Sequence, residues 1–291
     1  MRQTVVTAAR CPLMAGPAAE SEQLDELLLG WSAEILEEAA PGWYRVCSTY
    51  GYEGYAPAAA FCAGPEQAAA FTALPKAVVR AAYCSILAEP SVRSWPVAEA
   101  TRGALVVPLS RPDAEDWIKV ALPNGADGYT KSCYLSEYYK KPDLPEAQFR
   151  RAVADAALSY LGSSYRWGGK SPLGIDCSGL AFMAYWLNGA TIFRDARIEP
   201  GFPVREIPRS SVKRGDLLYF PGHVAVYLED GRYVHSTARA GGVVINSLDP
   251  AACGYRADLA QNLISVGSIF SRSPCQAPKT PSSLDKTGDN C

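Results

Sequence analysis

The sequence of 291 residues predicts an α+β domain at its C-terminal end, preceded by two small all-β domains. Three observations predict this fold class: an internal repeat of short β-type segments in the N-terminal half, a proline-containing linker after it, and helical patterns followed by strand-like runs. We expect domain boundaries at residues 1–72, 73–140 and 141–271, followed by a tail of residues 272–291.

The internal repeat is seen when residues 43–61 are aligned with residues 117–135 at a constant offset of 74. Both copies carry W-x-x-V followed by G-Y, in short β-type runs that glycine turns interrupt. The identical residues form the pairs Trp43 and Trp117, Val46 and Val120, Gly54 and Gly128, and Tyr55 and Tyr129. This pattern resembles bacterial SH3-like domains, which implies two small all-β SH3-like barrels. A single irregular β-domain is the alternative.

Pro142 and Pro145 mark the linker, because proline lacks a backbone donor and restricts the residue before it. Apolar residues then recur at helical spacing, which predicts a helix over residues 146–161 that Gly162 ends. A second helical stretch, CSGLAFMAYWLN, begins at Cys177, and the strand-like runs DLLYF, HVAVYL, RYVHSTA and GVVINSL follow it. This order of elements is that of an α+β domain.

Composition is ordinary for a globular protein, with 48% apolar and 20% charged residues. The final segment is rich in Ser, Pro and polar residues, which predicts a disordered tail.

A formal net charge of −2 gives no reason to expect nucleic acid as a partner. No apolar run approaches the roughly 20 residues that span a bilayer, so we expect no membrane insertion.

Nine cysteines are scattered along the chain without a C-x-x-C pair. Their odd number and irregular spacing favour neither a disulfide framework nor a zinc cluster. Scattered free thiols are typical of a reducing cytosol, and the first residues lack the apolar core of a signal peptide. We therefore expect a cytoplasmic protein. The alternative is an exported protein whose leader has been removed.

The chain contains only two histidines, His223 and His235, and both follow Cys177 in the predicted α+β domain. Cys177 stands at the first turn of an apolar helix, where the helix dipole favours a thiolate, so we expect it to ionise near neutral pH. A cysteine nucleophile also needs a base and a group that orients the base. The two histidines can fill these roles if their side chains share one face of the sheet.

The segment between the histidines predicts a hairpin with two possible registers. A two-residue Asp-Gly turn pairs His235 with Val226 and places the histidines on opposite faces. A three-residue loop with Gly231 in the left-handed region pairs His235 with Ala225, and His223 then lies diagonally on the same face. The chemistry predicts the second register, or a bulge that compensates.

Four ordered blocks within residues 146–270, namely Y-x-W-G-G, D-C-S-G-L, G-H-V-A-V-Y and V-H-S, resemble the signature of NlpC-type cell-wall peptidases. The resemblance implies a papain-like cysteine hydrolase domain, with helices packed on an antiparallel sheet. It implies that Cys177 attacks, that His223 transfers the proton, that His235 orients His223, and that Tyr165 helps to hold the oxyanion. No metal or cofactor is expected, because thiolate and imidazole supply the nucleophile and the proton transfer.

Members of this family with N-terminal SH3-like domains resemble γ-D-glutamyl-L-diamino acid endopeptidases of the dipeptidyl-peptidase VI type. The resemblance implies hydrolysis of the γ-D-Glu to diamino acid bond in murein tripeptides or tetrapeptides with a free N-terminal L-Ala. The product that the resemblance implies is L-Ala-γ-D-Glu, released in peptidoglycan recycling. We expect either diaminopimelate or lysine as the diamino acid, and a monomeric protein.

Three residues match the amine-binding positions of this subgroup: Asp176, Tyr52 and Glu22. Carboxylates suit an ammonium group because charge-assisted hydrogen bonds are strong. A structural role is the alternative for each, with Asp176 as a helix cap and Glu22 as a surface charge. Ser178 and Asp195 are further candidate substrate contacts, although the segment after Asp195 departs from the family pattern.

Three other functions stay open at this point. The chain could be a non-catalytic protein that binds cell-wall peptides, although an intact cysteine and two histidines argue against it. It could be an acyltransferase or amidase of the same superfamily. It could also be an exported hydrolase that remodels polymeric peptidoglycan.

Overall fold

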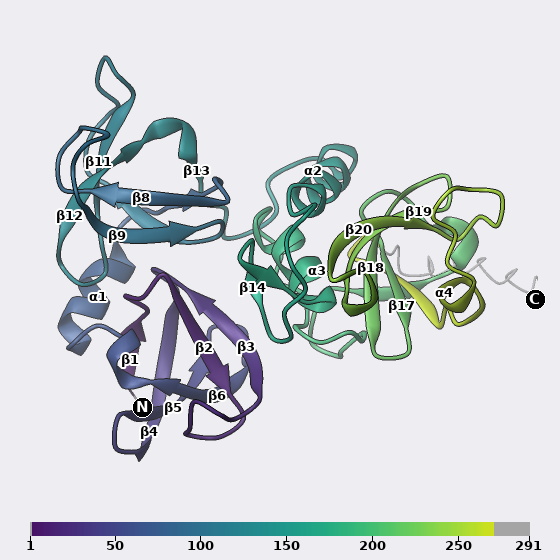
Figure 1. Cartoon of the computed structure of the whole chain (residues 1–291), viewed down its shortest axis with the longest axis horizontal. Coiled ribbons are helices and arrows are strands. Elements are labelled where there is room, and N and C mark those ends of the chain that lie inside the picture. Colours follow the sequence, from purple (N-terminus) through teal and green to yellow (C-terminus); the bar gives the residue numbers. More distant parts are fainter. Residues whose placement is uncertain (1, 271–291) are drawn as a thin grey trace, which may run out of the picture.

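Two antiparallel sheets follow one another in the N-terminal half of the chain, and an α+β region forms the C-terminal half (Figure 1). The computed structural model describes residues 2–270, so the predicted disordered tail of residues 272–291 lies outside the described residues. The prediction of an α+β domain preceded by two all-β regions is confirmed at this level.

The first sheet has six strands in the order β1-β4-β5-β6-β2-β3. A 3-10 turn, η1 (Ala58–Ala60), and helix α1 (Pro65–Ala73) lead from it to the second sheet. The strands of the first sheet are β1 (Arg2–Val5), β2 (Arg10–Met14), β3 (Gln23–Leu28), β4 (Ser32–Ala40), β5 (Trp43–Ser48) and β6 (Glu53–Pro57).

The second sheet has seven strands in the order β13-β7-β10-β11-β12-β8-β9. A 3-10 turn, η2 (Ser132–Tyr134), stands between its last two strands. The strands are β7 (Ala77–Val79), β8 (Tyr83–Leu87), β9 (Pro96–Thr101), β10 (Leu105–Pro108), β11 (Trp117–Ala121), β12 (Asp127–Lys131) and β13 (Leu135–Glu137).

The predicted internal repeat is confirmed by the strand pairing. β5 pairs with β6 so that Val46 lies opposite Gly54, and β11 pairs with β12 so that Val120 lies opposite Gly128. Packing requires both glycines: a Cβ added to Gly54 would lie 2.9 Å from a β2 side chain, and one added to Gly128 would lie 2.8 Å from the β8 backbone. The repeat therefore preserves the places where a neighbouring strand crosses most closely.

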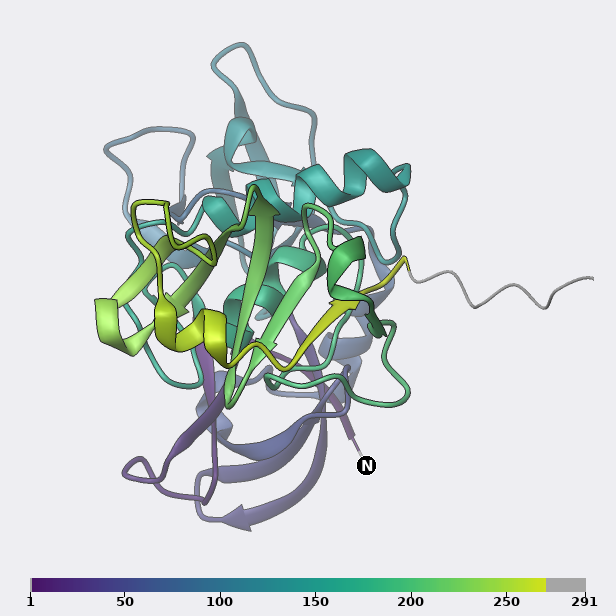
Figure 2. The ribbon, with the colours of Figure 1, turned by 90° about the vertical axis from the view of Figure 1, so that its right-hand side faces the viewer.

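The C-terminal region contains a six-stranded antiparallel sheet in the order β16-β21-β17-β18-β19-β20, with helices α2 and α3 packed on β18 and β19. Figure 2 views the chain from this side, with the two N-terminal sheets behind. The elements are α2 (Glu146–Leu158), β14 (Lys170–Ser171), β15 (Gly174–Ile175), α3 (Cys177–Trp186), β16 (Arg205–Ile207), η3 (Arg209–Ser211), β17 (Leu217–Phe220), β18 (His223–Glu229), β19 (Arg232–Thr237), η4 (Ala238–Ala240), β20 (Gly242–Ser247), α4 (Ala257–Gln261) and β21 (Ser265–Ser268).

Helix α2 begins where it was predicted and ends three residues earlier, at Leu158. The chain tightens there, because the N–H groups of Tyr160 and Leu161 donate to carbonyls only three residues back. Gly162 follows with φ of +81°, the left-handed conformation expected of a residue that ends a helix.

Every residue of α3 is buried, which explains a helix sequence that is apolar on all sides. One face packs on the sheet of its own region, and another meets the first sheet region, where Trp31 stacks on Trp186 with ring centroids 4.5 Å apart. The Trp31 indole N–H donates to the carbonyl of Gly103 in the second sheet region at 2.8 Å. The helix that carries Cys177 is therefore held by residues from all three parts of the chain.

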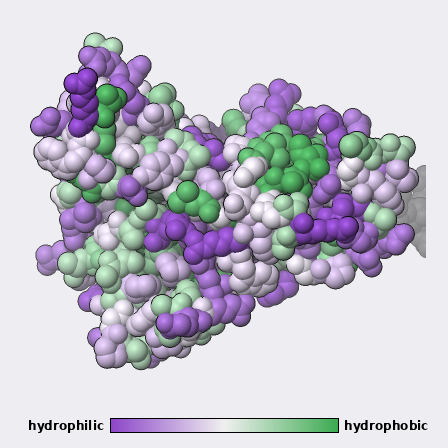
Figure 3. All heavy atoms as spheres, in the orientation of Figure 1, coloured by the Kyte–Doolittle hydropathy of each residue, from purple (hydrophilic) through white to green (hydrophobic). Residues whose placement is uncertain are grey.

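The surface is mostly polar on the face drawn in Figure 3, where green apolar atoms gather over the region of α2 and β20. Two apolar residues are exposed here: Leu161, which follows the end of α2, and Ile245, which lies on β20. Within residues 2–270, no helix has the length and hydropathy needed to cross a membrane.

Candidate active site

Cys177 is the first residue of α3, and Asp176 is its N-cap. The Asp176 carboxylate accepts a 2.6 Å hydrogen bond from the N–H of Gly179, which satisfies one of the free donors at the helix start. A Cβ at position 179 would lie 2.2 Å from the carbonyl oxygen of Gly169, so glycine lets the preceding loop lie against the first helical turn. The D-C-S-G block is thus a local solution for placing a thiol at a helix N-terminus.

The two histidines lie together, as the chemistry requires. Nε2 of His223 is 2.7 Å from Nδ1 of His235, and their rings meet edge to face with centroids 4.9 Å apart. The turn has two residues, Asp230 and Gly231, both with positive φ. A bulge at Leu228 shifts the register by one residue, so the predicted compensating bulge is confirmed.

Cys177 lies at the end of β18 that carries His223. The backbone N–H of Val224, the residue after His223, hydrogen-bonds to the thiol sulfur. Cys177 as a whole residue is 6% exposed. The nucleophile and both histidines therefore belong to one site, built from the N-terminus of α3 and two adjacent strands.

The electrostatic state of this site differs from the prediction of a thiolate at neutral pH. Burial, and then the charge of Asp176, raise the pKa of Cys177 to about 11. Burial also lowers the pKa of His223 to about 4, helped by the charges of His235 and Arg256, and burial lowers the pKa of His235 to about 4. The prediction was wrong because desolvation outweighs the helix dipole. The resting pair is a neutral thiol beside a neutral imidazole.

We expect the free energy of unfolding to fall as the pH is lowered from about 6.5 to about 4. Both histidines are neutral in the folded chain but take up protons once unfolded, because their folded pKa values are about 4 against an ordinary value of 6.5. The unfolded state binds more protons in this window, so stability decreases by up to about 3 kcal/mol per histidine. Urea unfolding at several pH values measures this loss. The double variant His223→Gln, His235→Gln should show a flatter profile, and an unchanged profile would contradict the assignment.

Tyr165 lies near the nucleophile, as predicted. It forms an isolated bridge with Ile175, and its backbone N–H donates to the carbonyl of Gly241 at 2.8 Å. Burial, and then the charges of Cys177 and Asp176, raise its pKa to about 12. Its phenol therefore stays protonated and can donate a hydrogen bond to an oxyanion.

A pocket of about 370 Å³ opens beside Cys177, between the first sheet region and the α+β region. The first sheet region contributes Leu24 and Tyr52 to its lining, and the α+β region contributes Trp167 and Asp195. Its walls thus come from segments that are far apart in the sequence. The pocket exists only when the two regions are docked.

A buried network of charged groups links the first sheet region to the α+β region beside the pocket, and the sequence did not predict it. Asp25 of β3 accepts hydrogen bonds from Lys170 Nζ at 2.9 Å and from Arg194 Nε at 2.6 Å. Arg194 also donates to both carboxylate oxygens of Asp176, at 3.1 and 2.9 Å, and Tyr50 donates to Asp25 at 2.5 Å. Two carboxylates thus balance two cations, all almost completely buried.

Four of the residues predicted to contact substrate form two pairs: Asp176 and Ser178 share the partner Arg194, and Tyr52 and Asp195 contact each other. Asp176 and Ser178 are already engaged by Arg194, with Ser178 Oγ 2.7 Å from Arg194 Nη1, so the capping role predicted as the alternative for Asp176 is present. Tyr52 donates to Asp195 at 3.2 Å across the two regions. All four line the pocket.

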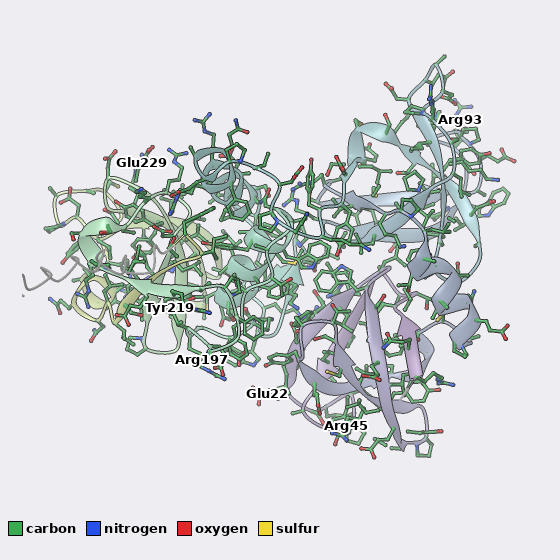
Figure 4. The ribbon with its side chains drawn as sticks, turned by 180° about the vertical axis from the view of Figure 1, so that it is seen from behind. Glu22, Arg45, Arg93, Arg197, Tyr219 and Glu229 are labelled. Carbon is green, nitrogen blue, oxygen red and sulfur yellow. The ribbon has the colours of Figure 1, made fainter. Side chains whose placement is uncertain are left out.

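Glu22 lies at the entrance to the junction. Its carboxylate accepts a 2.8 Å hydrogen bond from the indole N–H of Trp167, which lines the pocket. Figure 4 shows Glu22 on the first sheet region, with Arg197 across from it on the α+β region. Arg197 is paired with Glu199 at 2.8 Å and lies 3.5 Å from Asp195.

Asn246 is a further residue that the sequence did not indicate. Its side-chain oxygen lies 2.9 Å from Nε2 of His235. His235 pairs with Val244 on β20, so Asn246 is its diagonal neighbour on the same face. Only the register between β19 and β20 reveals this contact.

A buried cysteine at a helix N-terminus, with two histidines on adjacent antiparallel strands, defines a cysteine hydrolase site. Residues 162–260 match the NlpC/P60 family. The chain is 40% identical over 270 residues to dipeptidyl-peptidase 6 of Lysinibacillus sphaericus. This match covers 91% of this chain and 99% of that protein. The chain belongs to the NlpC/P60 family.

Two further comparisons agree with this membership. A gamma-D-glutamyl-L-lysine dipeptidyl-peptidase of Bacillus cereus is 31% identical over 133 residues, which is 42% of this chain and 39% of that protein. The crystal structure of a NlpC/P60 family protein from Bacillus cereus has a TM-score of 0.77 at 19% identity and covers 91% of this chain and 98% of that one. The likeness in fold extends over the N-terminal sheets.

Proposed function

We propose that this chain is a cysteine peptidase that hydrolyses the γ-D-glutamyl to diamino acid bond of murein peptides and releases L-Ala-γ-D-Glu. The observation that carries the proposal is the position of Cys177 and the paired histidines beside a pocket that the first sheet region closes on one side. Similarity to dipeptidyl-peptidase 6 over nearly the whole length of that protein supports it, because a match to 91% of this chain includes most of both regions that line the pocket.

The mechanism starts from the neutral thiol and imidazole. As the sulfur of Cys177 attacks the γ-carbonyl carbon of D-Glu, His223 takes the thiol proton and becomes an imidazolium that donates to His235. The oxyanion of the tetrahedral intermediate faces the N–H at the start of α3 and the phenol of Tyr165.

Collapse of the intermediate breaks the amide bond. The departing amine of the diamino acid takes the proton from His223, and the L-Ala-γ-D-Glu acyl group remains on Cys177 as a thioester. Water then attacks the thioester while His223 accepts its proton, and the same proton returns to the sulfur as the product leaves. No net charge is created at the end of the cycle.

Recognition of the free N-terminal amine rests on the carboxylates that remain available at the pocket. Asp25 and Asp176 are balanced by Lys170 and Arg194. Glu22, in contrast, accepts from a neutral donor, Trp167, while Asp195 accepts from Tyr52 and lies 3.5 Å from Arg197, whose closer partner is Glu199 at 2.8 Å. An ammonium group between them would gain charge-assisted hydrogen bonds.

N-acetylation of the substrate tests this function. We expect kcat/KM for L-Ala-γ-D-Glu-diaminopimelate, or for its lysine analogue, to fall by about 100-fold on acetylation, because one hydrogen bond to a charged group is worth about 1.5–3 kcal/mol. Chromatography of the released L-Ala-γ-D-Glu measures both rates. Glu22→Gln should shrink the difference, whereas Glu53→Gln, an exposed carboxylate of the same sheet paired with Arg45, should leave it unchanged. Equal rates for free and acetylated peptides would contradict the amine site.

We also propose that the two N-terminal sheets are SH3-like barrels, which the shared register of the two repeats supports. A bridge between Val6 and Phe61 brings the ends of the first sheet region together.

We further propose a cytoplasmic location. All seven cysteines within residues 2–270 are free thiols, which suits a reducing compartment. Cell fractionation that finds the native protein outside the cytosol would contradict the location.

A further inference from the structure

Asn246 continues the row of hydrogen bonds that begins at His223. His223 Nε2 lies 2.7 Å from His235 Nδ1, His235 Nε2 lies 2.9 Å from the side-chain oxygen of Asn246, and the Asn246 amide nitrogen lies 2.9 Å from the carbonyl oxygen of Gly254. The row ends on a backbone carbonyl. It therefore has a definite direction, which can be followed from that end.

A carbonyl oxygen can only accept, so the Asn246 NH₂ group must face Gly254 and the Asn246 oxygen must face His235. The oxygen also can only accept, so Nε2 of His235 carries a proton. In a neutral imidazole the other nitrogen is then bare, and Nδ1 of His235 accepts from Nε2 of His223. The unprotonated nitrogen of His223 is consequently Nδ1.

The local backbone holds the end of this row in place. The carbonyl oxygen of Gly254 also accepts a 3.0 Å hydrogen bond from the N–H of Ser247, and Ser247 forms a parallel bridge with Tyr255. Gly254 has φ of +84°, and a Cβ there would lie 3.3 Å from the Asn246 amide nitrogen. The loop before α4 is thus fixed against β20, and its carbonyl sets the orientation of the asparagine.

We propose that Asn246 is a positioning residue that fixes the tautomers of His235 and His223, so that His223 keeps Nδ1 free as the base of the reaction. The amide does this without adding a charge. This role rests on the proposed function for the identity of the base, but the tautomers can be observed without any peptide substrate.

Charged groups near the two histidines also act on their pKa values, and a test of Asn246 must take them into account. Arg256 and Asp258 form a close ion pair, at 2.6–2.8 Å, whose charges reach both histidines. Asp176 acts on His223 from the start of α3, and Tyr233 contacts the ring of His235 from the same strand. With the surrounding charges balanced, a new carboxylate at position 246 would be the dominant change.

The experiment compares Asn246→Ala, Asn246→Asp and the matched control Asn262→Ala. Asn262 also donates from its amide to a backbone carbonyl, that of Asp258, but it stands outside the row of hydrogen bonds that runs from His223 to Gly254. Nitrogen-15 NMR of the imidazoles reports which ring nitrogens carry protons. The pH profile of Cys177 alkylation by iodoacetamide reports the base without requiring hydrolysis of a peptide.

We expect single tautomers in the wild-type protein and in Asn262→Ala, and mixed tautomers in Asn246→Ala. Because general-base catalysis contributes about 10²–10⁴-fold, a base that is only partly in the correct tautomer should lose part of that factor in kcat, with little change in KM. Asn246→Asp should keep the tautomers and raise the pH of the acid limb by at least about one unit, since a carboxylate favours the imidazolium.

Unchanged tautomers in Asn246→Ala, or an unmoved acid limb in Asn246→Asp, would overturn the proposal. Thermal unfolding shows whether each variant is folded, and Asn246→Asp keeps the test valid if Asn246→Ala is not. Failure to hydrolyse the murein peptide with normal tautomers and normal alkylation would instead contradict the proposed function alone.

Discussion

Replacement of Asp25 by alanine is expected to lower the free energy of unfolding by about 3–5 kcal/mol, because it leaves buried cations without their partner. Lys170 is fully buried, and Asp25 is the carboxylate in contact with its ammonium group. Arg194 would keep only Asp176. Urea unfolding at pH 7 measures the loss.

The pH dependence of this loss identifies its cause. Burial lowers the pKa of Lys170 to about 8 even though the charge of Asp25 raises it, so without Asp25 the pKa should fall further. A folded pKa below the unfolded value means that stability rises with pH through that window. The difference between wild type and Asp25→Ala should therefore shrink at pH 9, where Lys170 is largely neutral in both.

A neighbouring carboxylate on the same strand provides the control. Glu26 is also buried, but its partner Arg10 is 29% exposed at the side chain and can return to water. Glu26→Gln should thus cost less than Asp25→Asn. The double variant Asp25→Leu, Lys170→Met should recover part of the loss, because it removes both buried charges together. Equal losses for Asp25→Asn and Glu26→Gln would contradict the role given to the network.

The sequence predicts those parts of the site that depend on neighbours in the chain. Cys177 at a helix start and the two histidines in one hairpin are local features, and the bulge that aligns them follows from the requirement that they share a face. The repeat is visible because Gly54 and Gly128 are fixed by close strand crossings. These features need no knowledge of the tertiary fold.

The features that the sequence does not reveal depend on contacts between distant segments. Arg194 and Asp25 are 169 residues apart, and nothing in either local pattern indicates the other. The state of Cys177 was predicted wrongly for the same reason, because a helix dipole can be inferred from the sequence whereas burial by β18 and the first sheet region cannot. Asn246 required the register of β20.

The second large effect is expected at His223. Replacement of His223 by alanine should reduce the alkylation rate of Cys177 at pH 7, and kcat, by about 10²–10⁴-fold, the usual contribution of a general base. With a pKa of about 11, the thiol alone is ionised in only about one molecule in 10⁴ at that pH. The wild-type protein avoids this limit because His223 removes the proton as the bond forms.

The two proteins should therefore differ in the slope of rate against pH. Wild-type alkylation should be nearly constant above an acid limb near pH 4, where His223 becomes protonated, whereas His223→Ala should react about tenfold faster for each pH unit toward 11. Mass spectrometry of the peptide that contains Cys177 separates its reaction from that of the exposed Cys133 and Cys253. Because Cys133 and Cys253 lie outside the site, their rates give the internal control. A wild-type slope as steep as that of His223→Ala would show that His223 does not act on the resting thiol, and the neutral-pair mechanism would then be wrong.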